Sequence, residues 1–134
     1  MVEVVNRQRS VKVDTEAWAT FATKALETIG NGASSATVAF VSDKSIRKLN
    51  QQFRGIDKAT DVLSFPADEP DNLGDVAVSV ETASRQAKEN GLSFDDEVRQ
   101  LILHGLLHLS GYDHQTDNGD MNRLELKLRR KLGI

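Results

Sequence analysis

Apolar positions along the chain recur with two periods, one typical of strands and one typical of helices. Short segments rich in β-branched and small apolar residues are predicted as strands, over residues 2–6, 36–42, 62–65 and 75–80. Longer segments with apolar side chains three and four residues apart are predicted as helices, over residues 14–28, 44–53, 81–89, 94–109 and 119–132. Strands and helices intermix without a linker or a repeat, so the pattern predicts one domain with a small mixed sheet.

Two of the predicted helices have clear N-terminal signals. Asp43 is the predicted N-cap of helix 44–53, and Ser93, with Asp96 three residues later, is the predicted start of helix 94–109. Helix 94–109 differs from the others because it is apolar almost all round. A helix without a polar face is typically central and buried, and we expect this position for it.

The composition is typical of a globular protein and excludes several other classes of protein. The chain has 134 residues, 39% hydrophobic and 28% charged, which is typical of one globular domain spanning residues 1–134. It has no cysteine, which excludes disulfides and thiolate metal ligands. With no membrane-length apolar run and no signal-peptide pattern, we expect a cytoplasmic protein without a membrane partner. The net charge of −3 argues against a protein that binds nucleic acid mainly through overall positive charge. The basic residues between Lys44 and Lys58 form a local cluster, which is typical of a solvated helix face.

All three histidines of the chain lie in the window HGLLHLSGYDH, at His104, His108 and His114. The first two are four residues apart in a predicted helix, so their imidazoles leave the same face about one turn apart. Gly111 permits a turn that would bring His114 back toward them. Three neutral imidazoles are the ligand set of a catalytic Zn²⁺ ion, with the fourth position left open. The spacing therefore predicts one zinc ion per chain, against the alternative of buried histidines that bond the backbone.

The residue after the first histidine separates this motif from that of zinc proteases. The histidine spacing matches one protease class, but those enzymes carry a glutamate as general base where this chain has Gly105. A glycine inside a helix also costs about 1 kcal/mol relative to alanine. Two explanations stay open: Gly105 leaves space for a substrate beside the metal, or it allows close helix packing.

Other polar residues are further candidates. Arg54 opens the polar loop RGIDK, and its planar guanidinium suits a phosphate, although an arginine in such a loop is more often solvated surface. Glu125 is predicted to be a solvated or capping charge, and Met121 to be core. Turn and cap hydrogen bonds are favoured over orientation of an imidazole for four further residues, Thr60, Asp61, Ser64 and Asp75.

Three segments of the chain, which occur in the same order as in the family, resemble the YbeY family of bacterial endoribonucleases, also called rRNA maturation factors. They are LNQQFRGIDKATDVLSFP (residues 49–66), LGDVAVS (73–79) and HGLLHLSGYDH (104–114). The histidine segment is the most specific of the three. The departures are small: Phe53 stands where the family commonly has tyrosine, and Ala59 where it commonly has proline. Neither belongs to the predicted metal ligands.

The resemblance implies an α+β fold, in which a small mixed four-stranded sheet packs with about five helices and the central buried helix carries the metal ligands. It implies that His104, His108 and His114 hold a metal, usually zinc, and that activity depends on His104 and Arg54. The implied function is single-strand-specific, metal-dependent endoribonuclease activity in small-subunit rRNA 3′-end maturation and ribosome quality control. Single-stranded RNA and the ribosome or its small subunit would be the partners.

Two functions of other classes stay open on the residues alone. One is a metal-dependent hydrolase of a peptide or small ester, and Gly105 argues against the peptide version. The other is a non-catalytic, ribosome-associated zinc module, and the open fourth ligand position argues against purely structural zinc. The route of RNA cleavage also stays open, because either water or the RNA 2′-OH could attack the phosphate.

Overall fold

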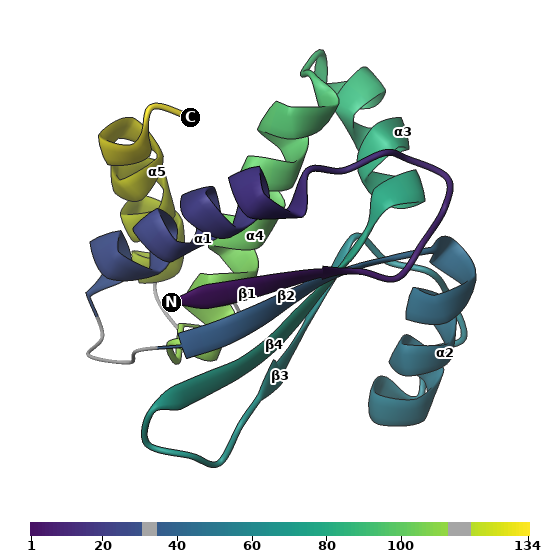
Figure 1. Cartoon of the computed structure of the whole chain (residues 1–134), viewed down its shortest axis with the longest axis horizontal. Coiled ribbons are helices and arrows are strands. Elements are labelled where there is room, and N and C mark those ends of the chain that lie inside the picture. Colours follow the sequence, from purple (N-terminus) through teal and green to yellow (C-terminus); the bar gives the residue numbers. More distant parts are fainter. Residues whose placement is uncertain (31–34, 113–118) are drawn as a thin grey trace.

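The computed structural model describes residues 1–30, 35–112 and 119–134, and in them five helices pack with a four-stranded sheet (Figure 1). The strands are β1 (Val2–Asn6), β2 (Ser35–Val41), β3 (Val62–Pro66) and β4 (Asn72–Ser79). The helices are α1 (Thr15–Ile29), α2 (Asp43–Arg54), α3 (Val80–Asn90), α4 (Phe94–Leu109) and α5 (Asp120–Leu132). The predicted α+β class is confirmed, and each predicted strand and helix overlaps an observed one.

The sheet is mixed, with strand order β1-β2-β4-β3. Strands β1 and β4 each pair in parallel with β2, and β3 pairs antiparallel with β4 at the edge. Successive side chains of a strand point to opposite faces, so each strand contributes to two layers. In β2, for example, Val38 and Phe40 belong to the larger core, whereas Val41 belongs to a smaller cluster on the other face.

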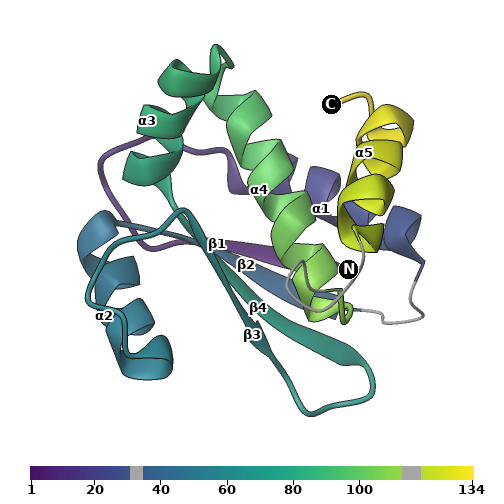
Figure 2. The ribbon, with the colours of Figure 1, turned by 180° about the vertical axis from the view of Figure 1, so that it is seen from behind.

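Helix α4 lies at the centre of the larger core. It contacts α1, α3 and α5 as well as β3 and β4, and Figures 1 and 2 show it crossing one face of the sheet, with α3 on one side and α1 and α5 on the other. Its residues Ile102, Leu103, Leu106 and Leu107 are fully buried, so the predicted central position is confirmed. Although α4 is apolar, it has 16 residues, and across the described part of the chain none of the helices could cross a membrane.

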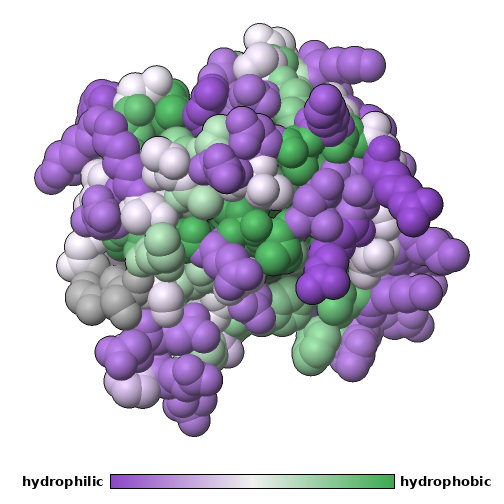
Figure 3. Space-filling view, in the orientation of Figure 1, coloured by the Kyte–Doolittle hydropathy of each residue, from purple (hydrophilic) through white to green (hydrophobic). Residues whose placement is uncertain are grey.

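Helix α2 packs on the opposite face of the sheet, where Ile46 joins a small cluster with Leu63 and Ala77. An apolar groove of about 440 Å³ runs between α2 and the strands, and its lining includes Val5, Ala39, Val41, Leu49, Phe53 and Phe65. Figure 3 shows apolar surface across the middle of the molecule, surrounded by hydrophilic side chains. The two faces of the sheet are therefore unequally covered.

The N-terminus of α2 differs from the prediction. Ser42, not Asp43, is the N-cap, because its hydroxyl accepts a hydrogen bond from a backbone N–H of the first turn. Asp43 instead accepts hydrogen bonds of 2.6 Å from the hydroxyls of Ser79 and Thr82, and lies 3.0 Å from the Arg85 guanidinium. Ser79 is the N-cap of α3, so the Asp43 carboxylate joins the N-termini of both helices.

Candidate metal centre

Helix α4 carries the two described histidines near its C-terminal end. Ser93 is the N-cap of the helix, and its side chain accepts a hydrogen bond from the Asp96 N–H, as predicted. The Nε2 atoms of His104 and His108 lie 3.1 Å apart, and the two ring centres are 4.6 Å apart. The His104 side chain is 27% exposed, so the two imidazoles converge at a place that solvent reaches.

The opposite edge of the His104 ring faces helix α5. Its Nδ1 lies 3.1 Å from Oε1 of Glu125, a residue that is only 5% exposed. The prediction that Glu125 is a solvated or capping charge is wrong. The missed signal is its spacing, because Glu125 lies four residues after Met121 and three before Leu128, on the buried face of α5. Met121 is fully buried, as predicted.

The contacts of His104 with Glu125 and His108 indicate which ring nitrogen carries the proton. An ionised carboxylate only accepts hydrogen bonds, so a neutral His104 beside it carries its proton on Nδ1. The lone pair of Nε2 then points toward His108. A tetrahedral ion bound by two imidazoles at the usual distance for zinc would hold their nitrogens about 3.3 Å apart. The observed 3.1 Å separation and the nitrogen donors therefore fit a zinc ion.

The third predicted ligand, His114, lies outside the described residues. Within residues 1–30, 35–112 and 119–134, no three histidine, cysteine or carboxylate side chains come together in a way that could hold an ion. The described part of the site is thus a two-histidine pair at the end of α4, followed by Gly111 with a positive φ of 98°. This backbone conformation favours glycine and allows the chain to turn after the helix, as the sequence predicts.

A polar hollow of about 220 Å³ lies on the Glu125 side of His104. Its lining residues are Asp61, Val62, Glu97, Gln100, Leu101, His104, Asn122, Glu125 and Arg129. Glu97 is a second buried carboxylate, and it accepts a 2.7 Å hydrogen bond from the side-chain amide of Asn90. The hollow therefore contains two buried acids with different partners.

Of the four polar residues near the strands, Thr60 and Asp61 form the local hydrogen bonds that the sequence favours, whereas Ser64 bonds across to helix α4. Asp61 accepts a hydrogen bond from the Val62 N–H at 2.7 Å and one from the Thr60 hydroxyl at 3.3 Å. The Ser64 hydroxyl donates to the Gly105 carbonyl at 3.1 Å. Asp75 lies beside the apolar groove on the other face of the sheet.

Gly105 faces the sheet. A Cβ atom added to it would lie 2.6 Å from Cγ1 of Val76 and 3.3 Å from Cγ2 of Val62. Of the two explanations, close packing of α4 on β3 and β4 accounts for the glycine. A glutamate there would point into this contact, so the arrangement has no place for the general base of the zinc proteases.

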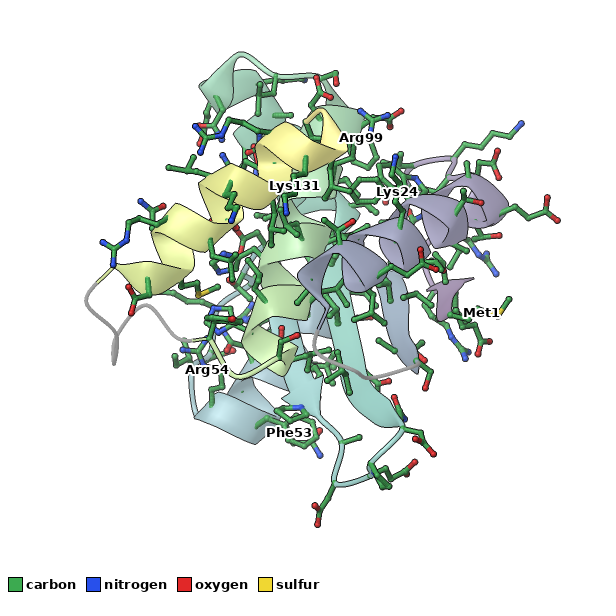
Figure 4. All side chains as sticks on the ribbon, turned by 90° about the vertical axis from the view of Figure 1, so that its left-hand side faces the viewer. Met1, Lys24, Phe53, Arg54, Arg99 and Lys131 are labelled. Carbon is green, nitrogen blue, oxygen red and sulfur yellow. The ribbon has the colours of Figure 1, made fainter. Side chains whose placement is uncertain are left out.

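Arg54 comes from a different element than the histidines. It is exposed at the C-terminal end of α2, beside Phe53, and Figure 4 shows the two side chains leaving the end of the helix in different directions. Among the described residues, no hydrogen bond or ion pair joins Arg54 to His104 or His108. The loop that follows Arg54 does return to the site, because Asp61 lines the polar hollow together with His104.

Comparison with known proteins relates the whole chain to one family. The family model described as Endoribonuclease YbeY matches residues 3–133. The Endoribonuclease YbeY of Nautilia profundicola is 53% identical over 94 residues, which cover 69% of this chain and 68% of that protein. The corresponding protein of Koribacter versatilis is 43% identical over 131 residues, covering 98% and 86%. A solution structure from Thermotoga maritima aligns with a TM-score of 0.70 at 30% identity, covering 98% of this chain and 89% of that one.

Proposed function

The chain belongs to the Endoribonuclease YbeY family, and from this premise we propose that it is a single-strand-specific, metal-dependent endoribonuclease. The RNA it cleaves is the 3′ end of the small-subunit rRNA, and its role extends to ribosome quality control in the cytoplasm. Its partners are single-stranded RNA and the ribosome or its small subunit. The observation that carries the proposal is the family match over residues 3–133.

The histidines hold the catalytic ion in this proposal. His104, His108 and His114 bind one Zn²⁺, and the nitrogen donors and 3.1 Å separation of the first two suit that ion. Such an ion, when bound, supplies Lewis-acid polarisation of a phosphoryl group. His104 presents Nε2 to the ion side of the site while its Nδ1 stays on the side of Glu125. The partial exposure of the pair leaves room for a strand of RNA to approach.

Arg54 offsets negative charge on the RNA. Its guanidinium is exposed at the end of α2, and no described carboxylate lies within ion-pair distance of it. A guanidinium without a carboxylate partner can bind phosphate oxygens through two parallel hydrogen bonds. We place Arg54 on a phosphate of the RNA strand as that strand passes the edge strand β3. There it stabilises the charge that develops during cleavage.

Cleavage of a labelled single-stranded RNA tests the proposal. Wild-type protein is compared with His104→Ala, each with and without a chelator, and the same RNA annealed into a duplex is the substrate control. We expect cleavage of the single strand that is lost on chelation, restored by added Zn²⁺ and absent from the variant. A 5′-phosphate product would indicate water as the nucleophile, and a cyclic 2′,3′-phosphate would indicate the RNA 2′-OH. Cleavage that survives both treatments, or none from a zinc-loaded wild type, would contradict the proposal.

A further inference from the structure

We propose that Glu125 is a positioning residue for the metal centre, which fixes the protonation site and the orientation of the His104 ring. The inference rests on the proposed metal-dependent function and adds a residue from a different helix to it. In this arrangement the Glu125 carboxylate holds the proton of His104 on Nδ1. The Nε2 lone pair of His104 is thereby directed to the side where His108 lies.

The placement of Glu125 is difficult to explain by packing. Its side chain is 7% exposed and shares the buried face of α5 with Met121 and Leu128. An apolar residue at this position would extend the core, whereas a buried carboxylate is unfavourable without a compensating partner. Arg129, one turn further along α5, is 3.8 Å from Oε2, a distance too long for a strong hydrogen bond. The Nδ1 atom of His104, at 3.1 Å from Oε1, is within hydrogen-bond distance.

The geometry matches how carboxylates act on metal-binding histidines in general. A carboxylate that accepts the second ring N–H fixes the tautomer, restricts rotation of the ring and makes the coordinating nitrogen more basic. All three effects favour metal binding at Nε2. Because α5 supplies the carboxylate and α4 supplies the histidines, the contact also fixes how the two helices pack around the site.

The polar hollow provides a matched control. Glu97 is 4% exposed and lines the same hollow, but its carboxylate bonds Asn90 at 2.7 Å. Glu97→Gln therefore removes a charge of equal burial within the same hollow. If burial of charge alone mattered, Glu97→Gln and Glu125→Gln would change the zinc affinity of the histidines equally. If Glu125 positions His104, only Glu125→Gln lowers this affinity.

The first measurement is zinc affinity of the full-length chain, by competition with a chromophoric chelator. Losing such a carboxylate typically weakens metal binding by about 10- to 100-fold, and we expect a loss in this range for Glu125→Ala. A smaller loss is expected for Glu125→Gln, because the amide oxygen can still accept from Nδ1–H. Glu97→Gln should bind zinc as wild type does. Wild-type affinity in both Glu125 variants would overturn the proposal.

The second measurement is the tautomer of His104 in metal-free protein, from long-range ¹H–¹⁵N NMR correlations at a pH where the imidazoles are neutral. We expect the Nδ1–H tautomer in wild type and in Glu97→Gln. Both tautomers are expected in Glu125→Ala, because alanine removes the group that accepts from Nδ1–H. An unchanged tautomer in Glu125→Ala would overturn the proposal. This measurement separates the two hypotheses, because it decides the role of Glu125 even if wild-type protein binds no zinc and cleaves no RNA.

Discussion

Arg54 is a residue whose proposed role involves a molecule outside the protein. Because it is exposed at the end of α2, Arg54→Ala should change the free energy of unfolding by no more than about 0.5 kcal/mol. Loss of one group that stabilises developing charge typically lowers a rate by about 10²- to 10³-fold. We expect Arg54→Ala to lower the rate of RNA cleavage by a factor in this range. Arg54→Lys should recover little of it, because an ammonium lacks the bidentate fork.

Lys48→Ala is the control for this measurement. Lys48 is an exposed cation on the same helix, so its removal lowers the local positive charge equally. Cleavage by Lys48→Ala should stay close to wild type at moderate salt, where general attraction of RNA is partly screened. Equal losses in the Lys48 and Arg54 variants would mean that α2 contributes only a general attraction for RNA.

Asp43 gives a prediction for stability as a function of pH. Burial raises the pKa of Asp43, but hydrogen bonds from Ser79, Thr82 and Arg85, together with the charge of Arg85, outweigh it and leave the pKa below its usual value. A carboxyl whose pKa is lower in the folded state stabilises the fold above its unfolded pKa, and this contribution disappears as pH falls through the folded pKa. Wild type should therefore be more stable than Asp43→Asn at pH 6, and the difference should shrink below about pH 4.

Urea unfolding of the two proteins across this pH range checks the prediction. The asparagine keeps an oxygen that can accept from the two hydroxyls, so the comparison isolates the charge. A stability difference that stays constant from pH 6 to about pH 3 would show that the carboxylate charge contributes nothing to the junction between α2 and α3.

At the scale of helices and strands, the sequence predicts most elements because their apolar periods agree with their packing. Helix α4 matches the predicted range 94–109 because its start is capped by Ser93 and its residues are buried all round. Strand β4 begins at Asn72 rather than residue 75, because pairing with β2 and β3 extends a segment that has weak strand propensity. Pairing of this kind is a tertiary effect that no local pattern contains.

The candidate site is predicted less completely than the fold. The i, i+4 spacing of His104 and His108 fixes their common face from local geometry alone. The contact between His104 and Glu125 spans 21 residues and depends on how α5 packs against α4. The same limit applies to Asp43, whose partners Ser79 and Thr82 lie in another helix and at its start. Polar contacts between elements are therefore the part of the site that the sequence does not predict.

Gly105 provides a prediction at the contact between α4 and the sheet. Gly105→Ala places a methyl group 2.6 Å from Cγ1 of Val76, and overpacking of a core typically costs about 1–3 kcal/mol. The gain in helix propensity, about 1 kcal/mol, offsets part of this cost. We expect a net loss in the free energy of unfolding, measured by urea denaturation.

The double variant Gly105→Ala with Val76→Ala tests the cause. If the two side chains collide, the double variant should be more stable than the sum of the single effects predicts. Zinc affinity in Gly105→Ala should stay near that of wild type where the protein is folded, because the glycine faces the strands. Additive stability losses, or loss of zinc binding from a folded Gly105→Ala protein, would instead favour a role beside the metal.

At the scale of the whole molecule, the core lies around α4 while the histidine pair lies at the end of that helix. The main core joins α1, α3, α4 and α5 to the sheet through buried apolar side chains. His104 and His108 are only partly buried and are not members of this cluster. We therefore expect this apolar core to form without a metal, in contrast to small zinc modules in which metal binding supplies the folding energy.

His108→Ala tests whether zinc acts on the fold or on the reaction. In metal-free protein, we expect the free energy of unfolding of this variant to lie within about 1 kcal/mol of the wild-type value. The reason is that the substitution removes a partly exposed side chain outside the core. Leu107→Ala, which truncates a fully buried neighbour, should lower the free energy of unfolding by about 2–5 kcal/mol. This variant is the control that shows whether the assay detects damage to the core. Zinc at about 100 times its Kd should stabilise wild type by about 2.7 kcal/mol and His108→Ala far less. Collapse of both chelated wild type and His108→Ala to an unfolded chain would instead identify a structural zinc site, and the catalytic assignment of the histidines would fail.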